Sequence, residues 1–162
     1  MILNKGDAFA VWENSKFLLA VPTAAGWTPS GRGLLKSPFA HRVLTKCPTL
    51  DIEYGRWCQE HGHTPMRSKR YRVVCVPTKP LNPADPHHTY LQYADPRLVE
   101  HAYKYLSKLD QTIISPLLGT IDGKMPLKDA FDIASRQAKN NIILVVGGSL
   151  WPILTSLQSK GG

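Results

Sequence analysis

Three short segments of the sequence contain residues that are typical of phosphate-binding loops. Each follows an apolar run, and they cover residues 22–33, 77–80 and 118–124. Glycines allow successive backbone N–H groups to turn toward an anion, and a helix that follows adds the positive end of its dipole. The two glycine-rich segments and the lysine of the middle one would suit a diphosphate if they meet at one edge of a sheet. Taken singly, each glycine-rich segment is equally typical of a plain turn between a strand and a helix.

Lys79, in the middle segment, is the side chain that could take part in making or breaking bonds. It is followed by Pro80, which stiffens the loop. A neutral lysine amine could attack an anomeric carbon, whereas a charged lysine would stabilise a phosphate. An ordinary charged loop lysine that contacts phosphate or solvent is the alternative, and the sequence leaves both interpretations open.

No group of residues has the spacing of a known metal site or catalytic triad. Cys58, His61 and His63 lie close together, but their spacing matches no standard zinc module. We therefore expect no metal ion and no other cofactor. Trp27 lies inside the first glycine-rich segment and could contact a ribose or a base, and Tyr90 could stack on a base.

The apolar pattern predicts strands and helices in alternation, which would position these segments. Strands are predicted over residues 8–12, 17–21, 71–76, 112–117 and 141–146, and helices around residues 39–44, 48–60, 96–109, 127–139 and 150–157. Alternating elements and wholly apolar strands are typical of an α/β protein whose sheet is covered on both faces. We therefore predict a single domain over residues 1–162, a three-layer α/β/α sandwich with a mixed, mostly parallel sheet. Ligands of such sheets bind beyond the carboxyl ends of the strands, where the three segments begin.

Composition narrows the class of partner. The chain has 162 residues and a formal net charge of +8, which favours anionic partners such as nucleotides or nucleic acid. Its densest basic stretch, residues 67–72, is also typical of a solvated loop before a strand. No apolar run reaches the ~18 residues of a membrane helix, so we expect no membrane partner. The three cysteines are too few for a disulfide framework, which favours a reduced, cytoplasmic location.

Five motifs occur in the order in which they occur in macro domains, and the chain resembles that family from about residue 5 to residue 146. They are Gly6-Asp7-Ala8-Phe9, similar to the Gly-Asp opening; residues 21–33, similar to the Val-Asn-x-x-Asn…Gly-Lys-Gly loop; residues 47–58, similar to the "Pro, then Tyr, then Cys" helix; Val76-Pro77-Thr78-Lys79, similar to the Pro-Thr-Lys loop; and residues 116–125, similar to the Pro-x-x-Gly-x-x-x-Gly-x-Leu phosphate loop. Among macro domains, the motifs are most similar to those of the DNA ADP-ribosyl glycohydrolase antitoxins.

This resemblance implies an ADP-ribose site and gives each motif a role. Asp7, together with Ala8, would recognise the adenine. Lys79 would act at the ADP-ribosyl link, because the lysine of the Pro-Thr-Lys loop is implicated in cleavage in those glycohydrolases. The other implied ligand-binding residues lie in two loops, one closing over the distal ribose and one cradling the diphosphate: Trp27, Gly31, Arg32 and Gly33 in the first, and Gly119, Thr120, Ile121, Asp122 and Gly123 in the second.

Two departures from the family pattern concern catalysis. Pro22 and Ala25 occupy the positions of the two loop asparagines, whose amides contact the distal ribose in the family. Groups that position a substrate often control rate more than affinity, so their loss favours binding over hydrolysis. The acidic residue that some relatives carry in the phosphate loop falls on Gly123, with Asp122 beside it.

Three hypotheses for function follow. The first is a macro-domain protein that binds ADP-ribose, with removal of ADP-ribose from DNA or protein as its candidate reaction. The second is a non-catalytic binder of free ADP-ribose or a related nucleotide signal. The third is a basic nucleic-acid-binding protein that reuses the fold, for which affinity should depend strongly on salt.

Overall fold

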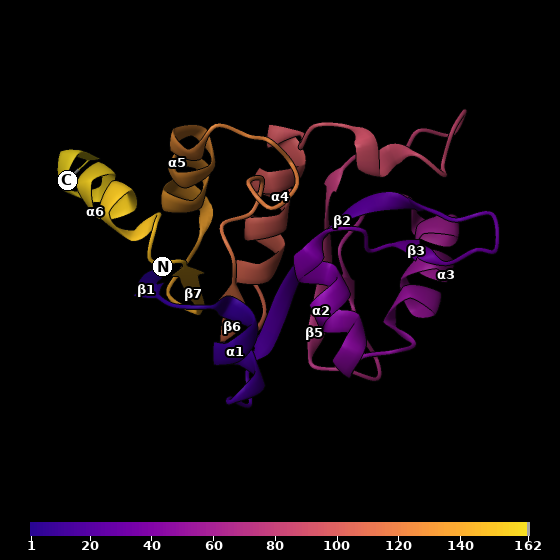
Figure 1. Ribbon diagram of the computed structural model, residues 1–162, viewed down its shortest axis with the longest axis horizontal. Helices are drawn as coiled ribbons and strands as arrows, with labels where there is room; N and C mark the ends of the chain where they lie inside the picture. Colours follow the sequence, from indigo (N-terminus) through magenta and orange to yellow (C-terminus); the bar gives the residue numbers. More distant parts are fainter. Residues whose placement is uncertain (162) are drawn as a thin grey trace.

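A computed structural model describes residues 1–161, and within them one seven-stranded sheet runs through the molecule (Figure 1). The order of its strands is β1-β7-β6-β2-β5-β4, with β3 paired to β2 off this path. The strands are β1 (Ile2–Lys5), β2 (Leu18–Trp27), β3 (Gly33–Leu34), β4 (Met66–Arg67), β5 (Val73–Lys79), β6 (Ile113–Ser115) and β7 (Ile142–Val146). Strands β1, β7, β6, β2 and β5 pair in parallel with their neighbours in this order. Strand β3 pairs antiparallel with β2, and β4 pairs antiparallel with β5. The predicted mixed, mostly parallel sheet is therefore confirmed.

Helices cover both faces of the sheet. They are α1 (Ala8–Glu13), α2 (Pro38–Lys46), α3 (Leu50–His61), α4 (Pro96–Ser107), α5 (Leu127–Gln137) and α6 (Trp151–Gly161), with a short 3₁₀ helix η1 (Thr89–Leu91). Side-chain caps begin three of them: Asp7 accepts from Phe9 N at α1, Ser37 from Ala40 N at α2, and Asp95 from Arg97 N at α4. None of the helices within residues 1–161 is long and apolar enough to cross a membrane.

The central strands bury side chains on both faces, and this divides the core in two. Leu18 and Ala20 of β2 pack with α4 and α5, whereas Leu19 and Val21 pack with α1, α2 and α3. Strand β5 alternates in the same way. Because successive side chains of a strand point to opposite faces, both sets must be apolar in a covered sheet. The predicted three-layer sandwich is confirmed.

The prediction of a strand over residues 8–12 is wrong, because this segment forms α1. The Asp7 carboxylate caps the helix by accepting from Phe9 N at 3.0 Å, and Ala8, Phe9 and Trp12 are buried. A five-residue apolar run does not distinguish a short helix from a buried strand. The first strand is instead β1, whose mostly exposed residues give no apolar signal.

Residues 22–27, which we predicted as part of a turn, continue strand β2 past a proline. Leu18 N donates to Thr112 O on the β6 side, and Leu19 N donates to Arg72 O on the β5 side. The backbone N–H groups of the even-numbered residues of β2 therefore point toward β6. However, β6 pairs with β2 only at Leu18 and Leu19. Pro22, which has no N–H, thus lies where no neighbouring strand needs one. Strand β2 therefore continues past the end of β6.

Candidate functional site

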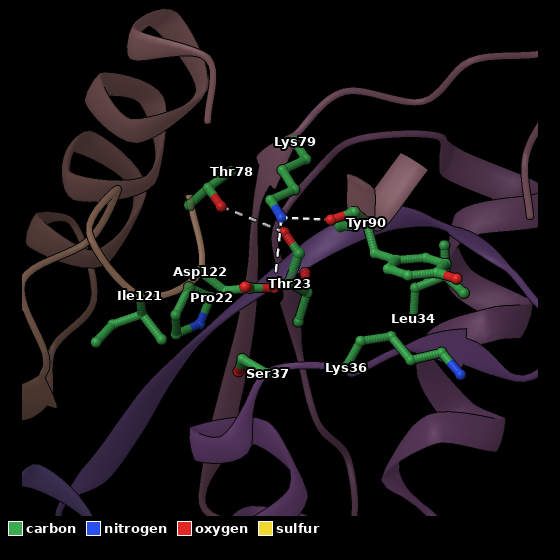
Figure 2. A pocket seen from close by; sticks show the side chains of 11 residues that line it. Pro22, Thr23, Leu34, Lys36, Ser37, Thr78, Lys79, Tyr90, Ile121 and Asp122 are labelled. Carbon is green, nitrogen blue, oxygen red and sulfur yellow. Dashed lines mark hydrogen bonds and ion pairs between the residues drawn. The ribbon is translucent and has the colours of Figure 1, made fainter. Parts of the chain in front are cut away.

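A pocket lies beside the middle of β2 and at the carboxyl end of β5 (Figure 2). Its volume is about 20 Å³, room for about one water molecule. The hollow that adjoins it, described below, is larger, at about 350 Å³. The lining residues come from β2, β3 and the segment after it, β5, η1 and the loop that follows β6: Pro22, Thr23, Ala24, Leu34, Lys36, Ser37, Thr78, Lys79, Tyr90, Ile121 and Asp122.

Lys79 ends β5, and its side chain extends into the middle of this pocket (Figure 2). The residue is only 4% exposed. Its Nζ donates to the carbonyl oxygen of Tyr90 at 2.5 Å and lies 3.5 Å from Oδ2 of Asp122. A buried ammonium without acceptors would be costly, and these two contacts provide them. Lys79 is therefore held in place.

The loop after β6 bends sharply to bring Asp122 to Lys79. Asp122 has φ +60° and Gly119 has φ +96°, and residues other than glycine rarely adopt such positive φ angles. A Cβ at Gly123 would lie 2.5 Å from the oxygen of Gly119 and 2.7 Å from Cβ of Ala94, so this position requires glycine. The tight packing stabilises the unusual backbone of Asp122.

The same loop has backbone donors that no other described residue uses. Among residues 1–161, the N–H groups of Ile121, Asp122 and Gly123 have no hydrogen-bond acceptor, whereas Leu118 N donates to the buried Tyr103 hydroxyl at 3.0 Å. Consecutive free N–H groups in a loop with a residue in the left-handed region form an anion-binding surface. Three consecutive N–H groups of this loop thus lack an acceptor among the described residues.

A second hollow adjoins the first and adds positive charge. It shares Lys36, Lys79, Tyr90 and Asp122 with the first and is also lined by Lys124. Three lysines against one aspartate leave the combined surface positive, which favours an anionic ligand. Sequence reasoning missed Lys36 and Lys124. Lys124 lies inside the phosphate-loop motif of residues 116–125, which was an available signal, but nothing in the sequence singled out Lys36.

Pro22, Thr23 and Ala24 of the first glycine-rich segment line the pocket, but its glycine-containing part, residues 26–33, lies elsewhere. It forms the hairpin between β2 and β3, and the oxygen of Gly31 sits so close to Gly55 of α3 that a Cβ on Gly55 would overlap it. Arg32 pairs with Asp51 of α3 at 3.2 Å. Gly31, Arg32 and Gly33 thus fasten the hairpin to α3. Trp27 is bonded to the loop after β5, because its backbone N–H donates to Pro86 O at 3.0 Å.

Asp7 and Ala8 lie at the carboxyl end of β1, away from the Lys79 pocket. Oδ1 of Asp7 caps α1, and Oδ2 pairs with Nη1 of Arg42 at 2.9 Å. The Arg42 guanidinium also lies over the Phe9 ring, 4.5 Å from its centroid. In the sheet, β7, β6 and β2 separate β1 from β5, so four strand spacings of about 4.8 Å lie between these two strands. The loop after β6 lies between them.

Pro22 and Ala25, which occupy the positions of the two family asparagines, differ in their surroundings. Pro22 lines the pocket, whereas Ala25 is fully buried and its carbonyl oxygen accepts from the Thr89 hydroxyl at 2.8 Å. The neighbouring Thr23 hydroxyl is bonded to the buried Tyr54 hydroxyl at 2.6 Å. No amide side chain therefore reaches the pocket from β2.

The cysteines and histidines do not form a second reactive centre. Cys47, Cys58 and Cys75 are all buried, and burial raises the pKa of the Cys47 thiol to about 11 and the pKa of Cys58 above its usual value. A thiol with a raised pKa is a poor nucleophile. Within residues 1–161, no group of three or more His, Cys, Asp or Glu side chains could hold a metal ion.

Comparison with known proteins identifies the fold. No protein-family model matches the chain, and no curated protein matches its sequence. Among solved structures, the macrodomain of Mycobacterium tuberculosis DarG is similar at a TM-score of 0.61 and 10% identity, over 89% of this chain and 97% of that one. A Bacteroides thetaiotaomicron protein of unknown function is similar at a TM-score of 0.60 and 11% identity, over 90% of this chain and 96% of that one. The X-domain of IBV is similar at a TM-score of 0.56 and 16% identity, over 99% of this chain and 98% of that one. The chain has the macrodomain fold, as the five motifs predicted.

Proposed function

We propose that this chain binds ADP-ribose, free or attached to a target, across the carboxyl ends of β1, β6 and β5. The observation that carries the proposal is the place of the 118–124 loop, with its free N–H groups, between Asp7 and Lys79 on a macrodomain fold. Asp7 would hold the adenine, the loop would hold the diphosphate, and the distal ribose would occupy the larger hollow beside Lys79.

The charges near the pocket support an anionic ligand with a polar end. A diphosphate would face backbone N–H groups and Lys124, while Lys79 would lie beside the ribose. Because Lys79 already has two protein acceptors, ligand binding would not have to order its side chain. A preformed site of this kind loses less conformational entropy on binding.

A specific observation also favours a second candidate, an ADP-ribosyl glycohydrolase. The Lys79 amine lies beside the hollow proposed for the distal ribose, and Asp122 is 3.5 Å away to accept its proton. Attack on the anomeric carbon would break the bond to the target, which leaves with a proton, and water would then release ADP-ribose from the lysine. The absence of polar side chains at Pro22 and Ala25 favours slow turnover or binding alone.

Calorimetric titration with ADP-ribose tests the proposal, with AMP and NAD as comparison ligands. Asp7→Ala and Lys79→Ala are compared with Lys128→Ala, an exposed lysine on α5. We expect ADP-ribose to bind, Asp7→Ala to weaken binding, and Lys128→Ala to leave it unchanged. No heat from the unmodified protein at millimolar ligand would refute the proposal.

Release of ADP-ribose from modified single-stranded DNA and modified protein then separates the two candidates. An enzyme that acts through Lys79 would lose turnover in Lys79→Ala while it still binds ADP-ribose. A protein that only binds would release nothing, and the substitution would change only its affinity.

A further inference from the structure

We propose that a groove between α3 and β4 is a binding surface for single-stranded nucleic acid. This surface, here called the α3 groove, has an apolar floor of Ile52, Trp57 and Met66 and a rim that contains Arg56, Arg67, Lys69 and Arg70. It shares no residue with the Lys79 pocket. The proposal does not depend on ADP-ribose binding.

The rim carries positive charge that the protein itself does not neutralise. Arg56, Arg67, Lys69 and Arg70 are exposed, and among residues 1–161 no carboxylate lies within 4.0 Å of their charged groups. Two acidic side chains also line the groove: Glu53, whose carboxylate is occupied by other donors, and the exposed Glu60, which lies 3.6 Å from Nε2 of His61. Four unpaired cations along one groove match the repeating negative charge of a phosphate backbone.

Glu53 instead organises the basic loop. Its carboxylate accepts from the Ser68 hydroxyl at 2.6 Å and from Lys69 N at 2.8 Å. The buried Ser68 hydroxyl in turn accepts from Arg70 N and Tyr71 N. The loop is thus fixed from inside while the Lys69 and Arg70 side chains remain exposed. A fixed loop of this kind presents its charges without a further ordering cost.

The floor explains why a single strand is the occupant. The Trp57 ring packs against His61 with 4.0 Å between centroids, and its Nε1 donates to Thr64 O at 2.9 Å, so the indole is held in a fixed orientation. An aromatic floor with cations beside it accepts unstacked bases and their phosphates together. A duplex keeps its bases stacked and could use only the rim.

The α3 groove has a neighbouring hollow at one end. Arg70 also lines this hollow together with Arg72, which extends the positive charge, whereas Lys46 of the same hollow is paired with Glu13 at 3.0 Å. At the other end, Leu81 N donates to His63 Nδ1 at 3.4 Å, which places the loop after Lys79 beside the segment between α3 and β4. This surface could therefore contact several nucleotides of a bound strand.

Fluorescence anisotropy with labelled oligothymidylate of about 12 nucleotides, within the range of ~4–16 bound by one domain, tests the proposal. The main variant is Arg56→Gln/Arg67→Gln/Lys69→Gln. The matched control is Lys108→Gln/Lys128→Gln/Lys139→Gln, which removes the same charge from exposed lysines at the other end of the molecule. Three lost phosphate contacts should flatten the log–log salt dependence by about 2 and weaken binding at least tenfold at low salt.

A second variant tests the floor. Trp57→Leu should weaken oligothymidylate binding about 5- to 100-fold while the salt dependence stays unchanged, and circular dichroism melts confirm that each variant is folded. The proposal is overturned if oligothymidylate does not bind at about 50 mM salt, or if the control triple variant loses as much affinity as the main one. Equal binding of a duplex of the same length, or of phosphatidylserine vesicles, would also overturn it.

Discussion

Replacing Gly55 by alanine should destabilise the protein, although alanine is the better helix former. Gly55 lies inside α3, where the substitution alone would stabilise the helix by about 1 kcal/mol. Here, however, the new methyl group would overlap the oxygen of Gly31 and lie 2.7 Å from the nitrogen of Gly33. These are backbone atoms, so no side chain can rotate away.

The two effects can be weighed against each other. Inserting a methyl group into packed structure costs about 1–3 kcal/mol, and the upper end applies because the whole hairpin must move. After the gain in helix propensity, we expect a net loss of about 2 kcal/mol in the free energy of unfolding. For a chain of this size, that lowers Tm by about 4–8 °C.

Urea and thermal unfolding of Gly55→Ala measure this loss directly. Gly147→Ala is the control, because a Cβ there would meet no atom within 4 Å, and it should change stability by less than about 0.5 kcal/mol. If Gly55→Ala were as stable as the unmodified protein, or more stable, the reasoning would fail. The glycine hairpin would then not be packed on α3 and would be free to close over a ligand.

Three further predictions follow. Tyr103→Phe leaves the buried Leu118 N–H without its acceptor, so urea unfolding should show a loss of about 1–3 kcal/mol. Burial raises the pKa of Cys47 to about 11, so its neutral thiol contributes stability that is fully present below the unfolded pKa of about 8.5 and is lost as pH rises toward 11. Urea midpoints between pH 7 and 11 should therefore fall less in Cys47→Ala; equal decreases would contradict this. Pro22→Asn should be tolerated because Pro22 lines the pocket, whereas Ala25→Asn puts an amide into a fully buried position and should lower Tm measurably.

The sequence predicted the sheet well where apolar strands are long and buried. Residues 71–76 and 141–146 were predicted as strands and form most of β5 and all of β7. It failed at α1 and β1, because one is a five-residue apolar run and the other is an edge strand with little burial. Helix boundaries marked by proline and a capping side chain, as at α4, lie close to their predicted positions.

By itself, the sequence determined the layered architecture, the positive charge and the order of the phosphate-loop motifs, because each of these depends on local residue types and their spacing. Only the tertiary structure decided where the motifs lie and which residues they contact. Lys79 meets Asp122 because β5 and the loop after β6 end at the same edge of the sheet. Gly31 and Gly33 pack on α3 because a helix glycine lies opposite them. Such contacts join residues far apart in the chain, and they follow from strand order and register, which no local pattern contains.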